Sequence, residues 1–218
     1  MTTQTTLVVI AKECVPGRVK TRLHPPFSLE QAATIANASL LDTLAAAAEL
    51  PAARRILYFD GTVVPPEAAG WDVIAQRAGS LDERIASIFD LCDGQTLLIG
   101  MDTPQVTPQM LAPVFEPWPR GVDAWFGPAN DGGFWVLALA APRAAVIRGD
   151  VIRGVPMSRS DTGSIQRQRM LEAGLVVRDL PELVDIDTVD DLFTVTDALP
   201  ASRLAQAVRS IRIEQGAR

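Results

Sequence analysis

Four cations gather in one short segment near the start of the chain. Residues 12–22 read KECVPGRVKTR, and a Pro-Gly turn within them leaves backbone amides free to face a ligand. Positive charge combined with unobstructed amide donors is what phosphate binding requires. The only two lysines of the chain, Lys12 and Lys20, both lie here, and a compact ammonium is not equivalent to a guanidinium at a phosphate. We therefore favour a phosphate site over a solvated basic loop. The expected contacts are Lys12, Pro16, Gly17, Arg18, Lys20, Thr21 and Arg22.

A carboxylate follows an apolar run further along the chain. Residues 96–104 read TLLIGMDTP, so Asp102 comes just after an expected buried strand. An aspartate in this position can hold Mg²⁺ or Mn²⁺ against phosphate oxygens. A turn capped by aspartate before a proline would explain the same residues. The motif by itself leaves both interpretations open, and the basic loop favours the metal.

A second acidic segment, DIDTVDD at 185–191, has two parts. If Thr188 is a helix N-cap, the two aspartates after it lie in the first helical turn, where they favour the helix dipole and have a structural role. Asp185 and Asp187 precede the cap on an extended segment and lie on the same side of it. Either could supply a second carboxylate to the metal, and we prefer Asp187. The expected metal ligands are thus Asp102 and Asp187.

The segment GPANDGGF at 127–134 is a strong turn signal between two apolar runs. Its local pattern favours a plain hairpin. The functional alternative is an acceptor-binding loop, in which Gly132 and Gly133 permit close approach and Asp131 contacts a substrate hydroxyl or a water on the metal.

The elements that must position these residues can be read from the apolar patterns. Buried strands are expected at 7–11, 55–59 and 96–100, with further strands at 71–75, 124–126, 134–140 and 175–177. Helices are expected to start at Ser28, Ser80, Thr107 and Thr188, with others at 142–148, at 161–173 and towards the end. The alternation predicts one α/β domain over residues 1–218, with three layers and a mixed, mostly parallel sheet. In such a sheet ligands bind at the carboxyl ends of the strands, where the polar clusters fall.

Composition excludes several other classes of function. Lys and Arg number 20 against 26 Asp and Glu, a formal net charge of −6, whereas a nucleic-acid-binding face is basic. A single histidine, His24, argues against a zinc site or a Ser-His-Asp triad. The longest apolar stretch, 134–142, is too short to span a membrane. We expect a cytoplasmic protein that binds neither nucleic acid nor membrane.

The ordered set of motifs resembles a family of bacterial nucleotide-diphospho-sugar transferase-like proteins, often labelled glycosyltransferases. It is more distantly similar to phospholactate guanylyltransferase and the molybdopterin nucleotidyltransferases. The resemblance spans about residues 7–195 and rests on PGRVKTRL at 16–23, GMDTP at 100–104, GP with DGG at 127–133, and DIDT at 185–188. Family members usually have proline where this chain has Cys14, and an aromatic-Ser/Thr pair where it has Met157-Ser158. The second departure leaves the acceptor undefined.

The resemblance implies a Rossmann-like GT-A fold that binds Mg²⁺ or Mn²⁺. It places the basic loop around nucleotide phosphates, Asp102 and Asp187 on the metal, and Asp131, Gly132 and Gly133 on the acceptor. It also places 76–81, with Gly79, near the base or sugar. A homodimer is compatible with it, although no residue pattern marks an interface.

Together these features predict a metal-dependent transferase with Lys20, Asp102 and Asp131 as catalytic residues. The reaction is either nucleotidyl transfer from a nucleoside triphosphate to a phosphorylated small molecule, or glycosyl transfer from a nucleotide sugar to a small-molecule acceptor. The alternative is a non-catalytic nucleotide-binding module of the same fold. As a loop cation, Lys20 is expected to contribute little to stability.

Overall fold

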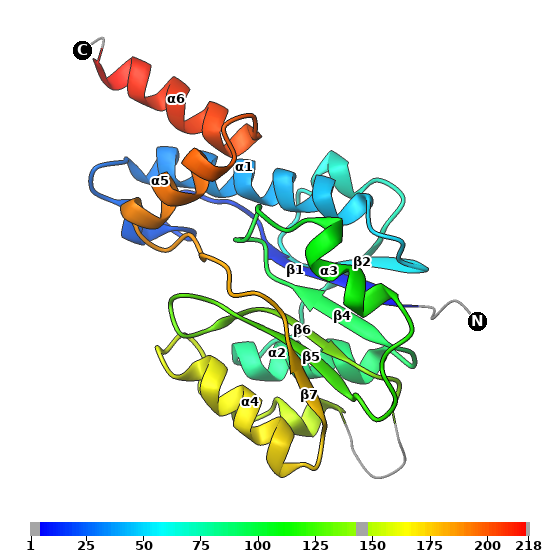
Figure 1. The fold of residues 1–218 in the computed structure, drawn as a ribbon. Coiled ribbons are helices and arrows are strands. Elements are labelled where there is room, and N and C mark those ends of the chain that lie inside the picture. The colour runs from blue at the N-terminus through cyan, green and yellow to red at the C-terminus, as the bar shows by residue number, and fades with distance from the viewer. Residues whose placement is uncertain (1–4, 143–147, 217–218) are drawn as a thin grey trace.

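The computed structural model describes residues 5–142 and 148–216. Its centre is a seven-stranded sheet in the order β3-β2-β1-β4-β6-β5-β7 (Figure 1). The strands are β1 (Thr6–Lys12), β2 (Arg54–Asp60), β3 (Asp72–Ala75), β4 (Thr96–Ile99), β5 (Ala124–Pro128), β6 (Phe134–Leu139) and β7 (Val177–Asp179). β6 runs antiparallel to both of its neighbours, and every other pairing is parallel. The predicted mixed, mostly parallel sheet is confirmed.

Helices cover both faces of this sheet. In Figure 1, α1 lies on one side of the sheet and α2 and α4 on the other, with α5 and α6 beyond α1. The helices are α1 (Leu29–Ala48), α2 (Leu81–Leu91), α3 (Pro108–Phe115), α4 (Thr162–Glu172), α5 (Val189–Ala198) and α6 (Arg203–Gly216). Short 3₁₀ helices occur at Thr21–Leu23, Pro66–Ala68 and Arg148–Val151. The three-layer architecture is confirmed.

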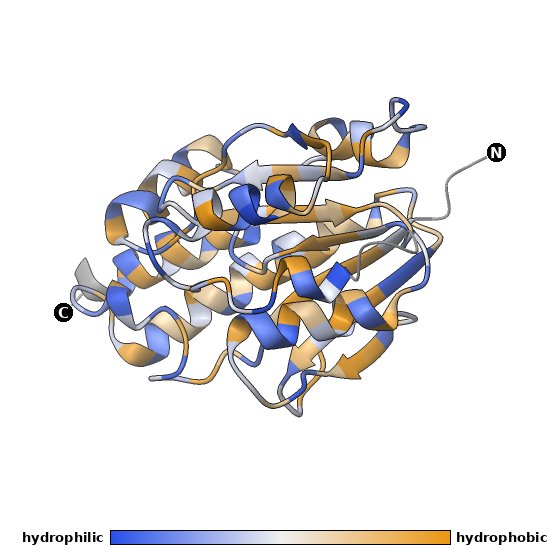
Figure 2. Ribbon diagram, turned by 90° about the horizontal axis from the view of Figure 1, so that it is seen from below, coloured by the Kyte–Doolittle hydropathy of each residue, from blue (hydrophilic) through white to orange (hydrophobic). Residues whose placement is uncertain are grey.

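Alternation along the strands divides the core between the two faces. Leu7 and Val9 of β1 pack into the cluster under α1 and α3, while Val8 packs into the cluster with α2 and α4. The middle of each central strand is therefore continuously apolar, as the orange strands in Figure 2 show, because successive side chains enter opposite cores. A third cluster joins α5 and α6 to α1 and includes Leu23 of the loop after β1. Among the described residues, no helix combines the length and apolarity that a membrane crossing needs.

Three helices begin with capping boxes at residues that were predicted as helix starts. The backbone amides of Ser28, Ser80 and Thr188 each donate to the side chain three residues later, at 2.9, 3.0 and 2.8 Å respectively. The last of these fixes the start of α5 directly after the acidic segment at 185–187. Predicted helix starts are therefore accurate wherever a polar side chain caps the first turn.

One predicted strand is shifted along the chain, and one predicted helix lies outside the described residues. The late strand lies at Val177–Asp179 rather than 175–177, because the amide of Leu175 still bonds to Met170 O at the end of α4. The short helix expected at 142–148 falls on residues 143–147, which lie outside the described residues.

The strand order creates a crevice between β1 and β4. The chain proceeds from β1 to β2 and β3 on one side, and β4 adds on the other side. Loops that leave two such adjacent strands run in opposite directions, and ligands bind in the crevice between them. The basic loop follows β1 and Asp102 follows β4, so the fold brings both to this crevice.

Candidate functional site

A cavity of about 700 Å³ opens at the carboxyl ends of β1 and β4. Its walls come from segments far apart in the sequence, including Lys12, Arg84, Asp102, Asp131, Arg159 and Asp185. A smaller pocket of about 150 Å³ adjoins it and is lined by Lys12, Lys20, Thr21, Arg22, Asp102 and Asp187 among others. The two spaces share several walls, so we treat them as one site.

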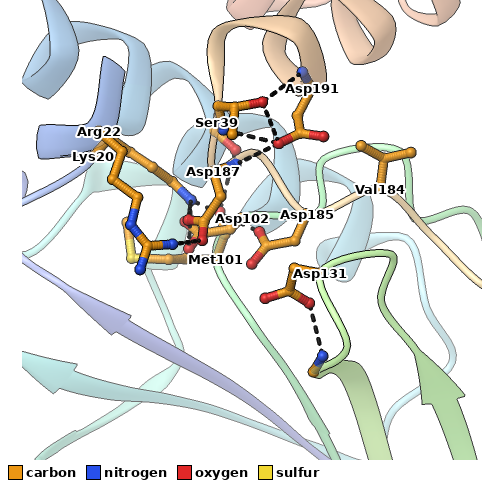
Figure 3. A network of polar contacts seen from close by, with 12 residues as sticks. Lys20, Arg22, Ser39, Met101, Asp102, Asp131, Val184, Asp185, Asp187 and Asp191 are labelled. Atoms are coloured by element: carbon orange, nitrogen blue, oxygen red, sulfur yellow. Dashed lines mark hydrogen bonds and ion pairs between the residues drawn. The ribbon is translucent and has the colours of Figure 1, made fainter. Parts of the chain in front are cut away.

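Three carboxylates converge on this site. One oxygen each from Asp131, Asp185 and Asp187 lies within 4.8 Å of the others, and the side chains face a common space (Figure 3). Oδ1 of Asp185 is buried and has no hydrogen-bond partner among the described residues. A buried oxygen without a partner needs a ligand or an ion, and an all-oxygen set suits Mg²⁺ or Mn²⁺. The residues therefore fit a divalent cation.

Lys20 lies beside this cluster. Its Nζ is 2.9 Å from Asp102 Oδ2, 3.6 Å from Asp187 Oδ1 and 3.7 Å from Asp185 Oδ1, and its side chain is only 7% exposed. The backbone of Lys20 is left-handed, with φ 44° and ψ 37°, a conformation that non-glycine residues rarely adopt and that clusters at functional sites. The structure thus uses Lys20 as a cation buried among carboxylates.

The charges of the site perturb one another. Burial disfavours the ammonium of Lys20, but the neighbouring carboxylates, chiefly Asp102, outweigh it and raise the pKa of Lys20. Burial also raises the pKa of Asp185 to about 7; Lys20 opposes this change, and the carboxylates of Asp102, Asp187 and Asp131 reinforce it. A site that concentrates carboxylates in this way has an unmet demand for positive charge.

Asn130 positions the segments that carry Asp131 and Asp185. Its Oδ1 accepts from the amide of Asp185 at 2.9 Å, and its Nδ2 donates to Asp191 Oδ1 at 3.1 Å. Its own amide donates to Leu183 O at 3.0 Å. Asn130 therefore ties the β5–β6 hairpin, which carries Asp131, to the segment that carries Asp185. A turn residue in sequence, it is a positioning residue in the fold.

Buried hydroxyls of α1 support the loop after β4. Ser39 and Thr43 donate to the carbonyl of Met101 at 3.2 and 3.4 Å. The sulfur of Met101 accepts from the amide of Lys12 at 3.4 Å. These contacts fix the backbone on both sides of the crevice and leave Asp102 facing Lys20.

Glycines in the β5–β6 hairpin allow the hairpin backbone to pack closely against the start of α4. A Cβ on Gly132 would lie 1.9 Å from Ser160 O, and Gly132 has φ +85°. A Cβ on Gly163, in the first turn of α4, would lie 2.3 Å from Gly133 O. The amide of Gly133 also donates to Asp131 Oδ1 at 2.8 Å. The hairpin is thus docked against the start of α4, with Asp131 and Gly133 on the cavity wall.

The structure divides the predicted nucleotide contacts into two groups. Lys12, Lys20, Thr21 and Arg22 line the site, and Arg22 Nη1 lies 2.5 Å from Asp187 Oδ2. Pro16, Gly17 and Arg18 are exposed and line neither the cavity nor the pocket. Gly79 also lies outside these linings; with φ +127° and a Cβ position 2.3 Å from Glu83 Oε2, it serves the cap of α2.

The carboxylates are grouped differently from the sequence expectation. Asp187 lies in the convergent cluster, but Asp102 is outside it and pairs with Lys20. Asp131, expected on the acceptor side, joins Asp187 instead, together with Asp185. Residue spacing could not decide between Asp185 and Asp187, because a tight turn, in which the amide of Asp187 bonds to Asp185 O at 3.0 Å, brings both to the site.

On the α2 side of the cavity, Gln76 belongs to the segment 76–81 that the resemblance placed near the base or sugar, whereas Arg84 was missed by sequence reasoning. Gln76 donates to the carbonyls of Ala11 and Tyr58 at 2.8 and 2.9 Å and accepts from Arg84 at 2.8 Å. Both residues line the cavity. An arginine within a helix carries no sequence signal for such a role.

Comparison with known structures agrees with this architecture. A protein from Desulfovibrio desulfuricans G20, provisionally named a nucleotide-diphospho-sugar transferase, shares 25% identity with a TM-score of 0.81, over 96% of this chain and 97% of that chain. A cytidylyltransferase from Leptospira borgpetersenii has 9% identity and a TM-score of 0.56, over 98% and 96% of the two chains. A 4-diphosphocytidyl-2C-methyl-D-erythritol synthase from Anaerococcus prevotii has 8% identity and a TM-score of 0.53, over 91% and 99%. The predicted GT-A type fold is confirmed.

At the level of sequence, no curated protein matches the chain. The profile of a family described as uncharacterized proteins conserved in bacteria, DUF2064, matches residues 41–159, more than half of the chain. The matched segment contains Asp102, Asn130 and Asp131 of the site. The chain belongs to the DUF2064 family and is similar in structure to the protein from Desulfovibrio desulfuricans G20.

Proposed function

We propose that the protein is a transferase that takes a nucleotide donor and a divalent cation in the crevice between β1 and β4. The observation that carries the proposal is the convergence of Asp131, Asp185 and Asp187, from two distant segments, on the wall of a 700 Å³ cavity. Relatives of the same fold, which are named as a nucleotide-diphospho-sugar transferase and a cytidylyltransferase, support the donor class.

The cation is Mg²⁺ or Mn²⁺, held by these three carboxylates. When bound, such an ion supplies positive charge against the phosphate oxygens of the donor. Asp185 Oδ1 is buried and accepts no hydrogen bond from the described residues, which supports its place among the ligands. Asp131 is thereby assigned to the ion rather than to the acceptor.

The donor phosphates lie against Lys12 and Arg22. Lys12 is exposed at the end of β1, and the side chain of Arg22 is 69% exposed while it touches Asp187. Both can therefore reach a ligand in the cavity, and fixed cations stabilise the charge that develops on a leaving phosphate or diphosphate. The nucleoside extends towards Gln76 and Arg84 on the α2 side.

The acceptor enters on the α4 side of the cavity. Gly133 and residues 157–160 form this wall, with Arg159 as its cation. In the reaction an oxygen of the acceptor forms a bond to the transferred group as the bond from that group to the donor breaks. If the donor is a nucleotide sugar, a nucleoside diphosphate leaves; if it is a nucleoside triphosphate, pyrophosphate leaves.

A thermal-shift and calorimetric screen tests the proposal. Nucleoside triphosphates and nucleotide sugars are offered with Mg²⁺, with Mn²⁺ and with EDTA. We expect stabilisation by one donor class that requires the metal, because only ligands bound by the native state raise Tm. The preferred class decides between nucleotidyl and glycosyl transfer, and release of pyrophosphate or nucleoside diphosphate then confirms turnover.

Matched variants make the screen specific. Asp187→Asn should abolish the metal-dependent shift, whereas Asp197→Asn, at an exposed carboxylate of α5, should leave it intact. Binding without turnover in the presence of a panel of acceptors would favour the non-catalytic nucleotide-binding module. If no nucleotide of either class binds at millimolar concentration, the proposed function is wrong.

A further inference from the structure

The number of divalent ions that the site can take is set by its charges. Four carboxylates, Asp102, Asp131, Asp185 and Asp187, lie around one space (Figure 3). Clusters of this size hold two divalent ions in many phosphoryl-transfer enzymes, with the ions roughly 3.5–4 Å apart and carboxylates shared between them. One divalent ion does not neutralise four carboxylates, so a further positive charge is needed beside Asp102.

Lys20 lies where a second ion would share ligands with the first. Its ammonium contacts Asp102 at 2.9 Å and is within 3.7 Å of both Asp185 and Asp187, which also belong to the convergent cluster. Asp131 belongs to that cluster but forms no ion pair with Lys20 among the described residues. Lys20 thus bridges Asp102 and the shared pair, as a second metal ion would.

We propose that Lys20 is a built-in second cation, so that the site takes one divalent ion instead of two and Asp102 is the counter-ion of Lys20. The inference rests on the proposed function for the first ion. Under this proposal Asp102 is the ion-pair partner of Lys20, whereas the sequence predicted a metal ligand. Lys20 neutralises the carboxylates of the site, whereas the sequence predicted a contact to a nucleotide phosphate.

The chemistry of lysine suits this position. A compact ammonium with three donors can point at three carboxylates, whereas a planar guanidinium needs a wider, flat arrangement. The left-handed backbone at Lys20 and the bond from the amide of Leu23 to its carbonyl at 3.0 Å hold the side chain inward. Arg22, which also touches Asp187, remains largely exposed and cannot take this place.

Titration of Mn²⁺ alone, followed by electron paramagnetic resonance of the free ion, tests the inference. We expect the wild-type protein to bind one Mn²⁺ per chain. Lys20→Met, which keeps the length of the side chain and removes its charge, should bind two, because Asp102 becomes available as a ligand. Combining Lys20→Met with Asp102→Asn should return the count to one, and Lys12→Met should leave it at one.

Asp102→Asn alone decides the question if Lys20→Met does not fold. Because Asp102 serves Lys20, this variant should bind one Mn²⁺ with an affinity within about threefold of wild type, whereas a lost ligand or its support costs roughly 10- to 100-fold. A loss of that size, two ions in the wild-type protein, or one ion in folded Lys20→Met would overturn the inference and leave the proposed function standing. A wild-type protein that binds no Mn²⁺ would overturn the metal site of the proposed function as well.

Discussion

Lys12 and Lys20, the two lysines of the chain, mark two ends of one loop and have opposite environments. Lys12 ends β1 and is exposed on the cavity wall. Lys20 follows the outer turn of the loop, and its ammonium is buried against Asp102, Asp185 and Asp187. The charge of Lys12 is thus accessible to a ligand, whereas the charge of Lys20 is neutralised by carboxylates of the protein.

The comparison shows that a cation's role depends on what surrounds it and not on its place in a motif. A cation exposed to solvent can bind a phosphate of a ligand. A cation buried among carboxylates is already paired and stabilises those carboxylates.

Removing each lysine should affect stability very differently. Lys20→Met should lower the free energy of unfolding by about 3 kcal/mol, because it leaves buried carboxylates without their partner. Lys12→Met should change it by less than about 0.5 kcal/mol. Urea unfolding of both variants in EDTA measures the difference. The burial of Lys20 reverses the expectation from sequence that it contributes little, and equal effects of the two substitutions would remove the distinction.

Asp185 should make stability depend on pH. Its pKa in the folded protein is raised to about 7, mainly by burial, from an ordinary value of 3.8, so between these pH values the folded state binds more protons than the unfolded state. Stability of the metal-free protein should therefore fall as pH rises from about 4 to about 7 and then level off. Asp185→Asn should flatten this part of the profile, measured by urea unfolding at each pH. An unchanged slope in the variant would assign the effect to another group.

Loss of the Asn130 side chain should weaken metal binding by the carboxylates and leave nucleotide binding unchanged. Asn130→Ala should weaken Mn²⁺ binding roughly tenfold, since residues that position ligands typically contribute 10- to 100-fold in affinity, while the nucleotide affinity at saturating Mn²⁺ stays unchanged. Asn37→Ala, on an exposed position of α1, is the matched control. A loss of nucleotide affinity at saturating Mn²⁺ equal to the loss of Mn²⁺ affinity would indicate general disruption instead.

Nucleotide affinity should follow exposure to the cavity. Lys12→Met should weaken binding of the preferred donor by about tenfold, near 1.4 kcal/mol. Arg18→Ala should change it by less than about twofold, because Arg18 is exposed outside the cavity and pocket and acts only through screened, long-range attraction. Calorimetry at two salt concentrations measures both. An equal loss for the two variants would show that the outer turn closes on the ligand.

The secondary-structure elements and their order could be predicted from the amino-acid sequence. Continuous apolar runs at β1, β2 and β4 predicted strands buried on both faces, and the caps at Ser28, Ser80 and Thr188 predicted helix starts correctly. These signals are local, since they depend on side-chain periodicity and on hydrogen bonds within one helical turn. They also placed Asp102, Asp131 and Asp187 after strands, and hence at one edge of the sheet.

Contacts between the charged groups could not be predicted from the sequence and are set by the fold. The sequence paired Asp102 with Asp187, but the fold brings Asp131 and Asp185 to Asp187 and inserts Lys20 between that group and Asp102. Asn130 and the packing of Gly132 against Ser160 set the hairpin at the required distance. Contacts of this kind depend on differences of a few ångströms between segments more than fifty residues apart, and no spacing along the chain encodes such distances.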